Sequence, residues 1–256
     1  MRALLVALAA CGPGIHAVRP DIVRDEPGCK LHDNLAEVPA AADAPLVVLY
    51  EHGAFFSPKL PSLVLWADGA LLYRPESSAW RIGRVDDADA IAREIAADLH
   101  ASTRYAEASV TMSDMPTIEI VARDGAAWRI TSVYGVERDA RGDGFAAAYR
   151  RLATLRPATG TPYDPPEVTV TLQPYPDALV EQPWPATIPP PPDGGGEVIV
   201  AGRDAPALRA LTPTGHDTEP AITSAGHKWR MRIAPRFRGQ ATIERVVHCA
   251  RRDERD

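Results

Sequence analysis

The sequence has little positive charge and little cysteine, and each shortage excludes a class of protein. Its 28 Lys and Arg residues are outnumbered by 34 Asp and Glu residues, which gives a net charge of −6. Proteins bind nucleic acids mainly through cationic side chains on the phosphates, so this balance argues against a nucleic-acid partner. Three cysteines in 256 residues are too few for a small scaffold built on disulfides.

The sequence also lacks the motifs that mark common catalytic sites. It contains no G-x-S-x-G, H-E-x-x-H, Walker A, G-x-G-x-x-G or C-x-x-C pattern. The seven histidines are scattered, and His248 would point to the opposite face from Cys249 on the strand that we expect there. We therefore assign no catalytic residue, no metal ligand and no cofactor from the sequence.

What the chain does contain is enough apolar material for one large domain or two small ones, since 45% of its residues are hydrophobic. Proline is abundant, with 25 residues against a usual share of about 5%. Many prolines lie in residues 157–192, which end in four consecutive prolines and are followed by three glycines at 194–196. This composition predicts a linker or a surface strap in extended polyproline conformation.

The first eleven residues are typical of an export signal. Arg2 supplies a positive charge, and residues 3–10 (ALLVALAA) form an apolar run too short to cross a bilayer, which takes about 20 residues. The run ends in Leu8-Ala9-Ala10-Cys11, which resembles the lipobox of bacterial lipoproteins. The alternative interpretation is that residues 3–10 form a buried strand or helix of a cytosolic protein.

The lipobox resemblance implies cleavage before Cys11 and a diacylglycerol on its sulfur, often with an acyl chain on its amine. Two or more chains anchor a protein stably, whereas a single chain binds only marginally. Gly12 follows the cysteine where an Asp would favour inner-membrane retention. In a Gram-negative cell this pattern is compatible with the outer membrane, so the expected location is the cell envelope on its extracytoplasmic side.

Lipidation of Cys11 would leave two cysteines, Cys29 and Cys249, in an oxidising compartment. A disulfide between them would join the start of the mature chain to its end. Two free buried thiols are the alternative, because spacing in the sequence does not fix the geometry that a disulfide needs.

Two similar patterns predict two hairpin–helix units between residues 45 and 156. After a strand beginning at Pro45, residues 62–74 carry two apolar runs around Asp68-Gly69, a strong hairpin signal. Residues 86–102 then place three apolar side chains at four-residue intervals on one helical face, preceded by aspartates suited to cap it. The same order recurs as a hairpin over 117–134, around Asp124-Gly125, and a helix over 145–155.

For the second hairpin we expect a three-residue turn. This turn sets Ile120 opposite Ile130 and Ala122 opposite Trp128, whereas a two-residue loop that set Glu119 opposite Ile130 would pair a carboxylate with an apolar side chain.

The C-terminal part of the sequence predicts a small β-α-β-β unit. Strands are expected at 197–201, 227–233 and 241–247, with a short helix through Leu211 that Asp204 caps. Residues 167–172 (EVTVTL) alternate well enough to form a further strand, so the proline-rich segment is not all linker.

These elements give an α+β fold with an antiparallel sheet. The expected divisions of the chain are a signal peptide at 1–10, a tether at 11–44, a main domain at 45–156, a strap or linker at 157–196 and a small unit at 197–256. Whether the strap separates two domains or packs against the sheet stays open at this point.

Several segments resemble a family of uncharacterised secreted lipoproteins of actinobacteria and myxobacteria-like bacteria. They are LVLWADGALLYR, DMPTIEIVARDG, TPYDPPEVTV, QPWP and the strand around Trp229, and the similarity covers the chain from about residue 45 onward. The resemblance implies an envelope location and a related fold, and it supplies no catalytic residues.

One local charge pattern stands out within this acidic protein. Lys228, Arg230 and Arg232 share one face of the strand expected at 227–233, and Trp229 and Met231 share the other. Arg236 and Arg238 continue the spacing beyond Pro235, and residues 226–240 contain no acidic side chain.

Such a stripe has two interpretations. It is either a solvated face neutralised by acidic residues of a neighbouring strand, such as Glu197 or Glu244, or a site for an anionic envelope component or partner protein. We expect a non-enzymatic envelope lipoprotein that acts as a binding or structural module. The alternative is an envelope hydrolase whose site is assembled from residues far apart in the sequence.

Overall fold

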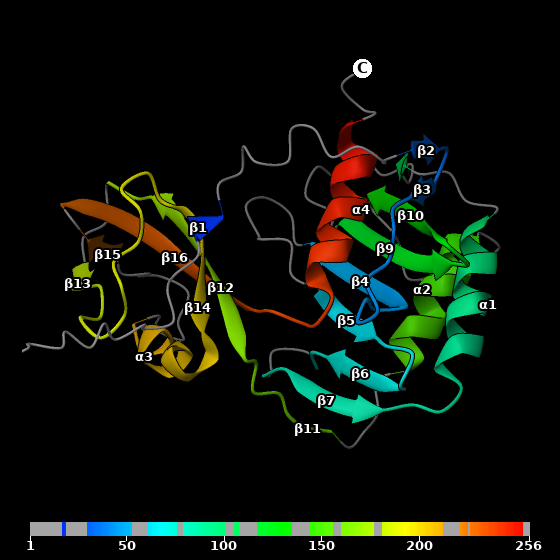
Figure 1. Ribbon diagram of the computed structural model, residues 1–256, viewed down its shortest axis with the longest axis horizontal. Coiled ribbons are helices and arrows are strands. Elements are labelled where there is room, and N and C mark those ends of the chain that lie inside the picture. The colour runs from blue at the N-terminus through cyan, green and yellow to red at the C-terminus, as the bar shows by residue number, and fades with distance from the viewer. Residues whose placement is uncertain are drawn as a thin grey trace, which may run out of the picture. The chain divides into compact units, whose positions relative to one another are not determined.

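The chain adopts an α+β fold with four α-helices and two mostly antiparallel sheets (Figure 1). The computed structural model describes residues 17–18, 30–52, 61–75, 79–100, 105–107, 117–134, 144–155, 160–176, 181–211, 221–224 and 226–252. The chain divides into two compact units, of which unit 1 comprises residues 1–24 and 165–236 and unit 2 comprises residues 25–164 and 237–256.

Unit 2 is built on a ten-stranded sheet with the order β11-β7-β6-β5-β4-β9-β10-β3-β2, and β8 pairs with β10. Its strands are β2 (Lys30–His32), β3 (Leu35–Glu37), β4 (Val47–His52), β5 (Pro61–Leu65), β6 (Ala70–Tyr73), β7 (Arg81–Arg84), β8 (Tyr105–Glu107), β9 (Thr117–Asp124), β10 (Ala127–Tyr134) and β11 (Thr161–Pro162). Its helices are α1 (Ala88–His100), α2 (Gly144–Thr154) and α4 (Gln240–Arg252).

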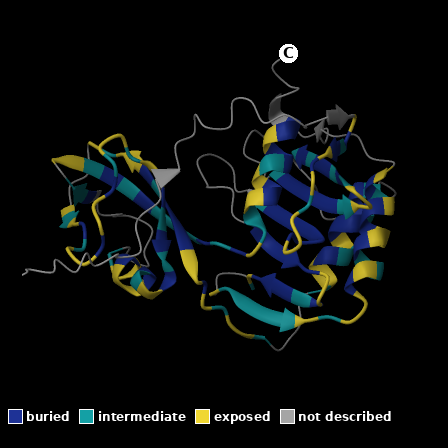
Figure 2. Cartoon of the chain, in the orientation of Figure 1, coloured by how far each residue is buried: buried dark blue, intermediate teal, exposed yellow. Residues whose placement is uncertain are grey.

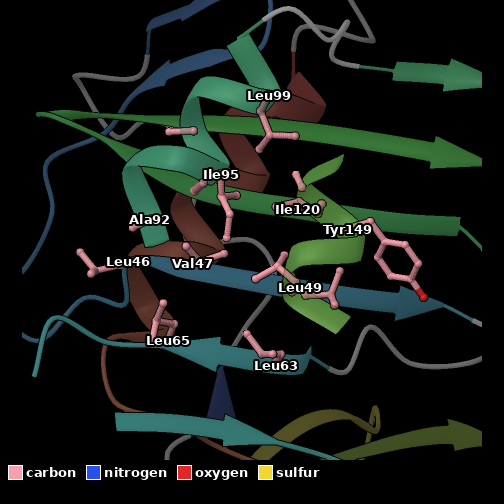
Figure 3. Packing of buried hydrophobic residues seen from close by; sticks show 14 of the residues in the cluster. Leu46, Val47, Leu49, Leu63, Leu65, Ala92, Ile95, Leu99, Ile120 and Tyr149 are labelled. Carbon is pink, nitrogen blue, oxygen red and sulfur yellow. The ribbon is translucent and has the colours of Figure 1, made fainter. Parts of the chain in front are cut away.

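Helices cover both faces of this sheet. Helices α1 and α2 pack on one face, where Ile95 and Leu99 of α1 meet Val47, Leu49 and Ile120 from the central strands (Figure 3). On the other face α4 packs over a second core, to which the strands contribute mainly these side chains: Val48, Val64, Leu72, Val121, Trp128 and Ile130. The central strands of unit 2 are therefore buried on both sides, which explains their nearly continuous apolar sequences.

Unit 1 contains a six-stranded sheet with the order β1-β14-β12-β16-β15-β13. Its strands are β1 (Ala17–Val18), β12 (Glu167–Pro174), β13 (Glu181–Pro183), β14 (Gly196–Ala201), β15 (Ala221–Ser224) and β16 (His227–Pro235). The 3-10 helix η2 (Gly202–Asp204) leads into α3 (Ala205–Arg209). Alternate residues of β12, β14 and β16 pack with Leu208 of α3 and with Trp184 into a single core.

The two predicted hairpins and their helices are present in unit 2. Strands β5 and β6 flank Asp68-Gly69, β9 and β10 flank Gly125-Ala126, and each hairpin precedes its helix in the chain. Between β6 and α1 lies a further strand, β7, which the sequence did not predict and which pairs with β6. Both turn glycines have a positive φ, +80° at Gly69 and +61° at Gly125, a conformation that residues with a Cβ rarely adopt.

The predicted register of the second hairpin is wrong by one residue. A two-residue turn joins β9 and β10, so that Ile130 pairs with Val121 and Trp128 with Arg123. The prediction of a three-residue turn depends on pairing apolar side chains on one face of the hairpin. Because both faces of this sheet are buried, that criterion does not distinguish the two registers.

The strand predicted over 241–247 is also wrong, because these residues lie in α4. The β-branched side chains in the segment favour a strand by propensity. However, four of its apolar residues recur at helical spacing and are buried in the core that α4 shares with the unit 2 sheet: Ile243, Val246, Val247 and Ala250. The small C-terminal unit therefore lacks its last strand, and its final helix belongs to the other unit.

The observed units also differ from the expected divisions of the chain. Residues 30–37, expected to lie in the tether, form β2 and β3 at one edge of the unit 2 sheet. The division between the two units falls within the proline-rich segment, between Asp164 and Pro165, and the strand expected in this segment is β12, which lies between β14 and β16 in the unit 1 sheet. Asp204 occupies the position before α3 as expected, although its side chain makes no capping hydrogen bond.

Candidate anion-binding face

Strand β16 carries a cationic face and an apolar face, as its sequence predicts. Trp229 and Met231 are 4% and 5% exposed and lie in the core of unit 1. Lys228, Arg230 and Arg232 alternate with them and are half-buried. Figure 2 shows the buried and intermediate colours along the strands of unit 1. Alternate residues of a strand are about 6.6 Å apart, so these three side chains span roughly 13 Å.

The strands beside β16 supply polar neighbours to this face. Thr171 of β12 pairs with Arg232 on one side and with Glu197 of β14 on the other. Gln173 of β12 pairs with Arg230, and Thr223 of β15 pairs with Lys228. We define the cationic face as Lys228, Arg230 and Arg232 together with the three polar residues that pair with them, Thr171, Gln173 and Thr223, all of which are half-buried or exposed.

Each cation of the face has a different environment. The Nζ of Lys228 lies 2.5 Å from the Oε1 of Glu181 on β13, so this charge is largely neutralised. The guanidinium of Arg230 lies over the ring of Tyr175, 4.5 Å from its centroid. Within the described part of the chain Arg232 has no ion pair and no hydrogen bond from its side chain, so its charge is the one most available to a ligand.

Arg236 and Arg238, which continue the spacing in the sequence, do not extend the cationic face. The Nε of Arg236 lies 3.7 Å from the Oε2 of Glu167, and its Nη1 donates to the hydroxyl of Thr169 at 3.4 Å. Arg238 belongs to unit 2, where its guanidinium binds Asp68.

Three of the five cations pair with acidic residues other than Glu197 and Glu244. Glu181, Glu167 and Asp68 neutralise Lys228, Arg236 and Arg238. Glu197 is two strands away from Arg232, with Thr171 between them. Glu244 lies on α4 in unit 2 and accepts a hydrogen bond from Gln240 at 2.8 Å.

The pairing of Arg238 with Asp68 fixes the start of α4 to the first hairpin of unit 2. One Nη of Arg238 lies 2.6 Å from the Oδ1 of Asp68, and the guanidinium lies 4.8 Å from the ring centroid of Trp66. The hydrogen bond from Arg238, aided by one from the backbone of Ala70, lowers the pKa of Asp68. Asp68 was identified in the sequence as a turn residue, and its partner 170 residues away carried no local signal.

A shallow depression of about 630 Å³ lies where β6, β7 and β11 meet in unit 2. Its two arginines already serve the fold, because Arg81 donates to the carbonyl of Gly160 and Arg84 donates to the carbonyl of Asp68. The other described residues that line it carry no carboxylate, imidazole or thiol; they are Ala70, Ile82, Gly83, Gly160 and Thr161.

Among the described residues, no three His, Cys, Asp or Glu side chains gather closely enough to hold a metal ion. None of the described helices has the length and apolar character to cross a membrane.

Cys249 is buried on α4, where it is 3% exposed and packs in the core that α4 shares with the sheet. Cys11 and Cys29 lie outside the described residues. Lys30, directly after Cys29, begins β2, and α4 packs against β2 and β3.

Comparison of the chain with protein-family models, with curated proteins and with solved structures gave no match.

Proposed function

We propose that the protein is a cell-envelope lipoprotein, anchored through Cys11, that acts as a non-enzymatic binding module for an anionic envelope component. The observation that carries the binding role is the cationic face of unit 1, in which Arg232 is half-buried and has no ionic partner in the described part of the chain. Anionic ligands bind such groups through charge-assisted hydrogen bonds, which are stronger than neutral ones.

The proposed location in the cell envelope depends on residues 3–11. An apolar run of eight residues followed by small residues and a cysteine is the arrangement that lipoprotein processing requires. An acidic chain with a net charge of −6 gains little from general attraction to an anionic surface, so a covalent lipid would supply most of the attachment.

A disulfide between Cys29 and Cys249 belongs to the same proposal. Both residues fall in unit 2, and Cys29 directly precedes a strand that packs against the helix carrying Cys249. Disulfides persist in the oxidising compartments outside the cytoplasm. The pair would fix the start of the folded chain to its last helix.

Lipidation of Cys11 and cleavage before it are tested by metabolic labelling with a palmitate analogue and by mass spectrometry of the mature N-terminus. We expect label on the parent protein, none on Cys11→Ser, and a mature chain that begins at residue 11. An unlabelled parent chain that retains residues 1–10 would contradict the lipoprotein assignment.

The binding role is tested by retention on isolated envelope. Replacing Arg230 and Arg232 with Ser should abolish the salt-sensitive part of the retention, because screening weakens exposed charge interactions. The matched control is Arg203→Ser with Arg209→Ser, which removes the same charge from exposed positions beside and within α3 in the same unit. Equal retention of both double variants would refute a role for the cationic face.

A further inference from the structure

Few residues separate Cys11, the proposed site of lipidation, from strand β1 of unit 1. Ala17 and Val18 pair with Val198 and Glu197 on β14, the neighbour of β12 in the unit 1 sheet. Only six residue steps separate Cys11 from Ala17. A fully extended chain covers about 3.3–3.6 Å per residue, so this edge of the sheet lies no more than about 22 Å from the lipidated cysteine.

The cationic face lies close to that same edge. Three inter-strand steps lead from β1 through β14 and β12 to β16, which at about 4.8 Å each amount to roughly 14 Å. Arg232 therefore lies within about 36 Å of the cysteine, before its side chain extends further. The lipid headgroups of the anchoring bilayer are within this reach in any envelope.

We propose that the cationic face binds the anionic headgroups of the bilayer that carries the Cys11 anchor. This inference rests on the lipidation proposed above and names the ligand of the same face. Binding would hold unit 1 against the membrane surface, with the lipid as the first attachment and the arginines as the second. Combining an acyl anchor with cationic side chains gives firmer attachment than a single signal does.

The chemistry of the face fits phosphate headgroups. Guanidinium groups bind phosphate oxygens through paired N–H donors, and the side chains of Thr171 and Gln173 beside them supply further donors. Among the described residues, those that form the cationic face include no aliphatic side chain that would enter the hydrocarbon, since Trp229 and Met231 pack in the core of unit 1. Attachment would therefore be superficial and sensitive to salt.

Chemical protection of Arg232 tests the inference directly. The lipidated parent protein is reconstituted into vesicles of phosphatidylcholine alone, or of phosphatidylcholine with phosphatidylglycerol. It is then treated with phenylglyoxal, and mass spectrometry measures the modification of each arginine. We expect Arg232 to be protected on the anionic vesicles only, with the protection lost at high salt. Arg203, which is exposed beside α3, should react equally on both vesicles and serves as the internal control.

The length of the connection provides a second variant that leaves the face intact. Inserting a Gly/Ser linker of about 20 residues between Gly14 and Ile15 should reduce the protection of Arg232. A longer flexible linker lowers the effective concentration of the face at the bilayer. Full protection despite the insertion would overturn the argument from tether length.

The affinity of the face itself is measured with the mature chain bearing Cys11→Ser, which has no lipid. In sedimentation with anionic vesicles, the affinity should fall about 30-fold when Arg230 and Arg232 are replaced by Ser. Since a tenfold change corresponds to about 1.4 kcal/mol, this is a loss of about 2 kcal/mol for the two arginines together. The Arg203→Ser, Arg209→Ser control should bind as the parent does.

The outcomes separate this inference from the proposed function. Equal modification of Arg232 on the two kinds of vesicle overturns the headgroup assignment. If the Cys11→Ser chain then binds isolated sacculi through the same arginines, the ligand is a wall polymer and the binding module stands. If the parent protein carries no lipid on Cys11, both proposals fail.

Discussion

The sheets of the two units differ in how many of their faces are covered. In unit 2, α1 and α2 cover one face and α4 covers the other, so that Val121 and Ile120, neighbours on β9, are both fully buried. In unit 1 one face packs into a core with α3, and the other carries threonines, a glutamine and the cations of β16. The sequences reflect this difference. Strands buried on both faces are nearly continuous in apolar residues, whereas strands buried on one face alternate apolar and polar residues.

The two sheets therefore differ in how many side chains they can present to a ligand. A strand buried on both faces has no side chain available to a ligand, whereas a strand buried on one face presents every second residue. The candidate functional site therefore lies in the unit with the smaller core.

Trp128→Ala should cause the greatest loss of stability. Trp128 is fully buried under α4, and its Nε1 donates to the carbonyl of Val38 at 2.9 Å. Removing the ring should lower the free energy of unfolding of unit 2 by about 3–5 kcal/mol. Denaturant titration followed by hydrogen exchange will show the loss in unit 2, and a matching loss in unit 1 would contradict the division into two units.

A matched pair of glutamine substitutions compares the two kinds of sheet directly. Val121→Gln places an amide in the fully buried core of unit 2 and should cost about 2–4 kcal/mol. Thr171→Gln makes the same side chain on the polar face of β12, where the cost should stay within about 0.5 kcal/mol. Similar losses of Tm in the two variants would show that the cationic face is covered.

Removing the proposed disulfide should destabilise unit 2 and leave unit 1 unchanged, since both cysteines belong to unit 2. Cys29→Ser is preferable to a change at Cys249, because Cys249 is buried and its loss would also leave a cavity. We expect a loss of about 2–4 kcal/mol, equal to the effect of a reductant on the parent protein. Two free thiols in the unfolded mature chain without reductant would refute the pairing.

The smallest effect is expected at the ion pair between Asp68 and Arg238. Both side chains are nearly half exposed, 49% and 45%, so Asp68→Asn should cost less than about 1 kcal/mol at neutral pH. The pKa of Asp68 is lowered in the folded protein, so its contribution is present above the unfolded value of 3.8 and is lost as the pH falls through the folded value. Tm measured against pH should show the parent and variant converging in acid, and a constant difference would contradict the assignment.

Local patterns were sufficient to predict much of the fold. Both hairpins, α1 and α2, the strands β12, β14 and β16, and the alternation of cationic and apolar side chains on β16 follow from turn signals and periodicity within short windows. The errors occurred where tertiary context outweighs local preference. The β-branched residues of α4 suggested a strand, and the burial of both faces of the unit 2 sheet concealed the register of β9 and β10.

The extent of the candidate site depended on the tertiary structure. The sequence presented five cations at a regular spacing, from Lys228 to Arg238. The chain passes from unit 1 to unit 2 between Arg236 and Phe237, so Arg238 joins Asp68 in the other unit. Glu181 and Glu167 neutralise two further cations. No pattern local to residues 227–238 contains these partners.

Residue spacing along short stretches of chain was enough to predict the α+β class, the elements of the hairpin units and the two faces of β16. Three features required the folded chain: the last helix completes unit 2, β12 lies at the centre of unit 1, and Arg232 has no ionic partner among the described residues. Each of these depends on contacts between residues distant in the chain, because such pairs form only when the whole core has assembled.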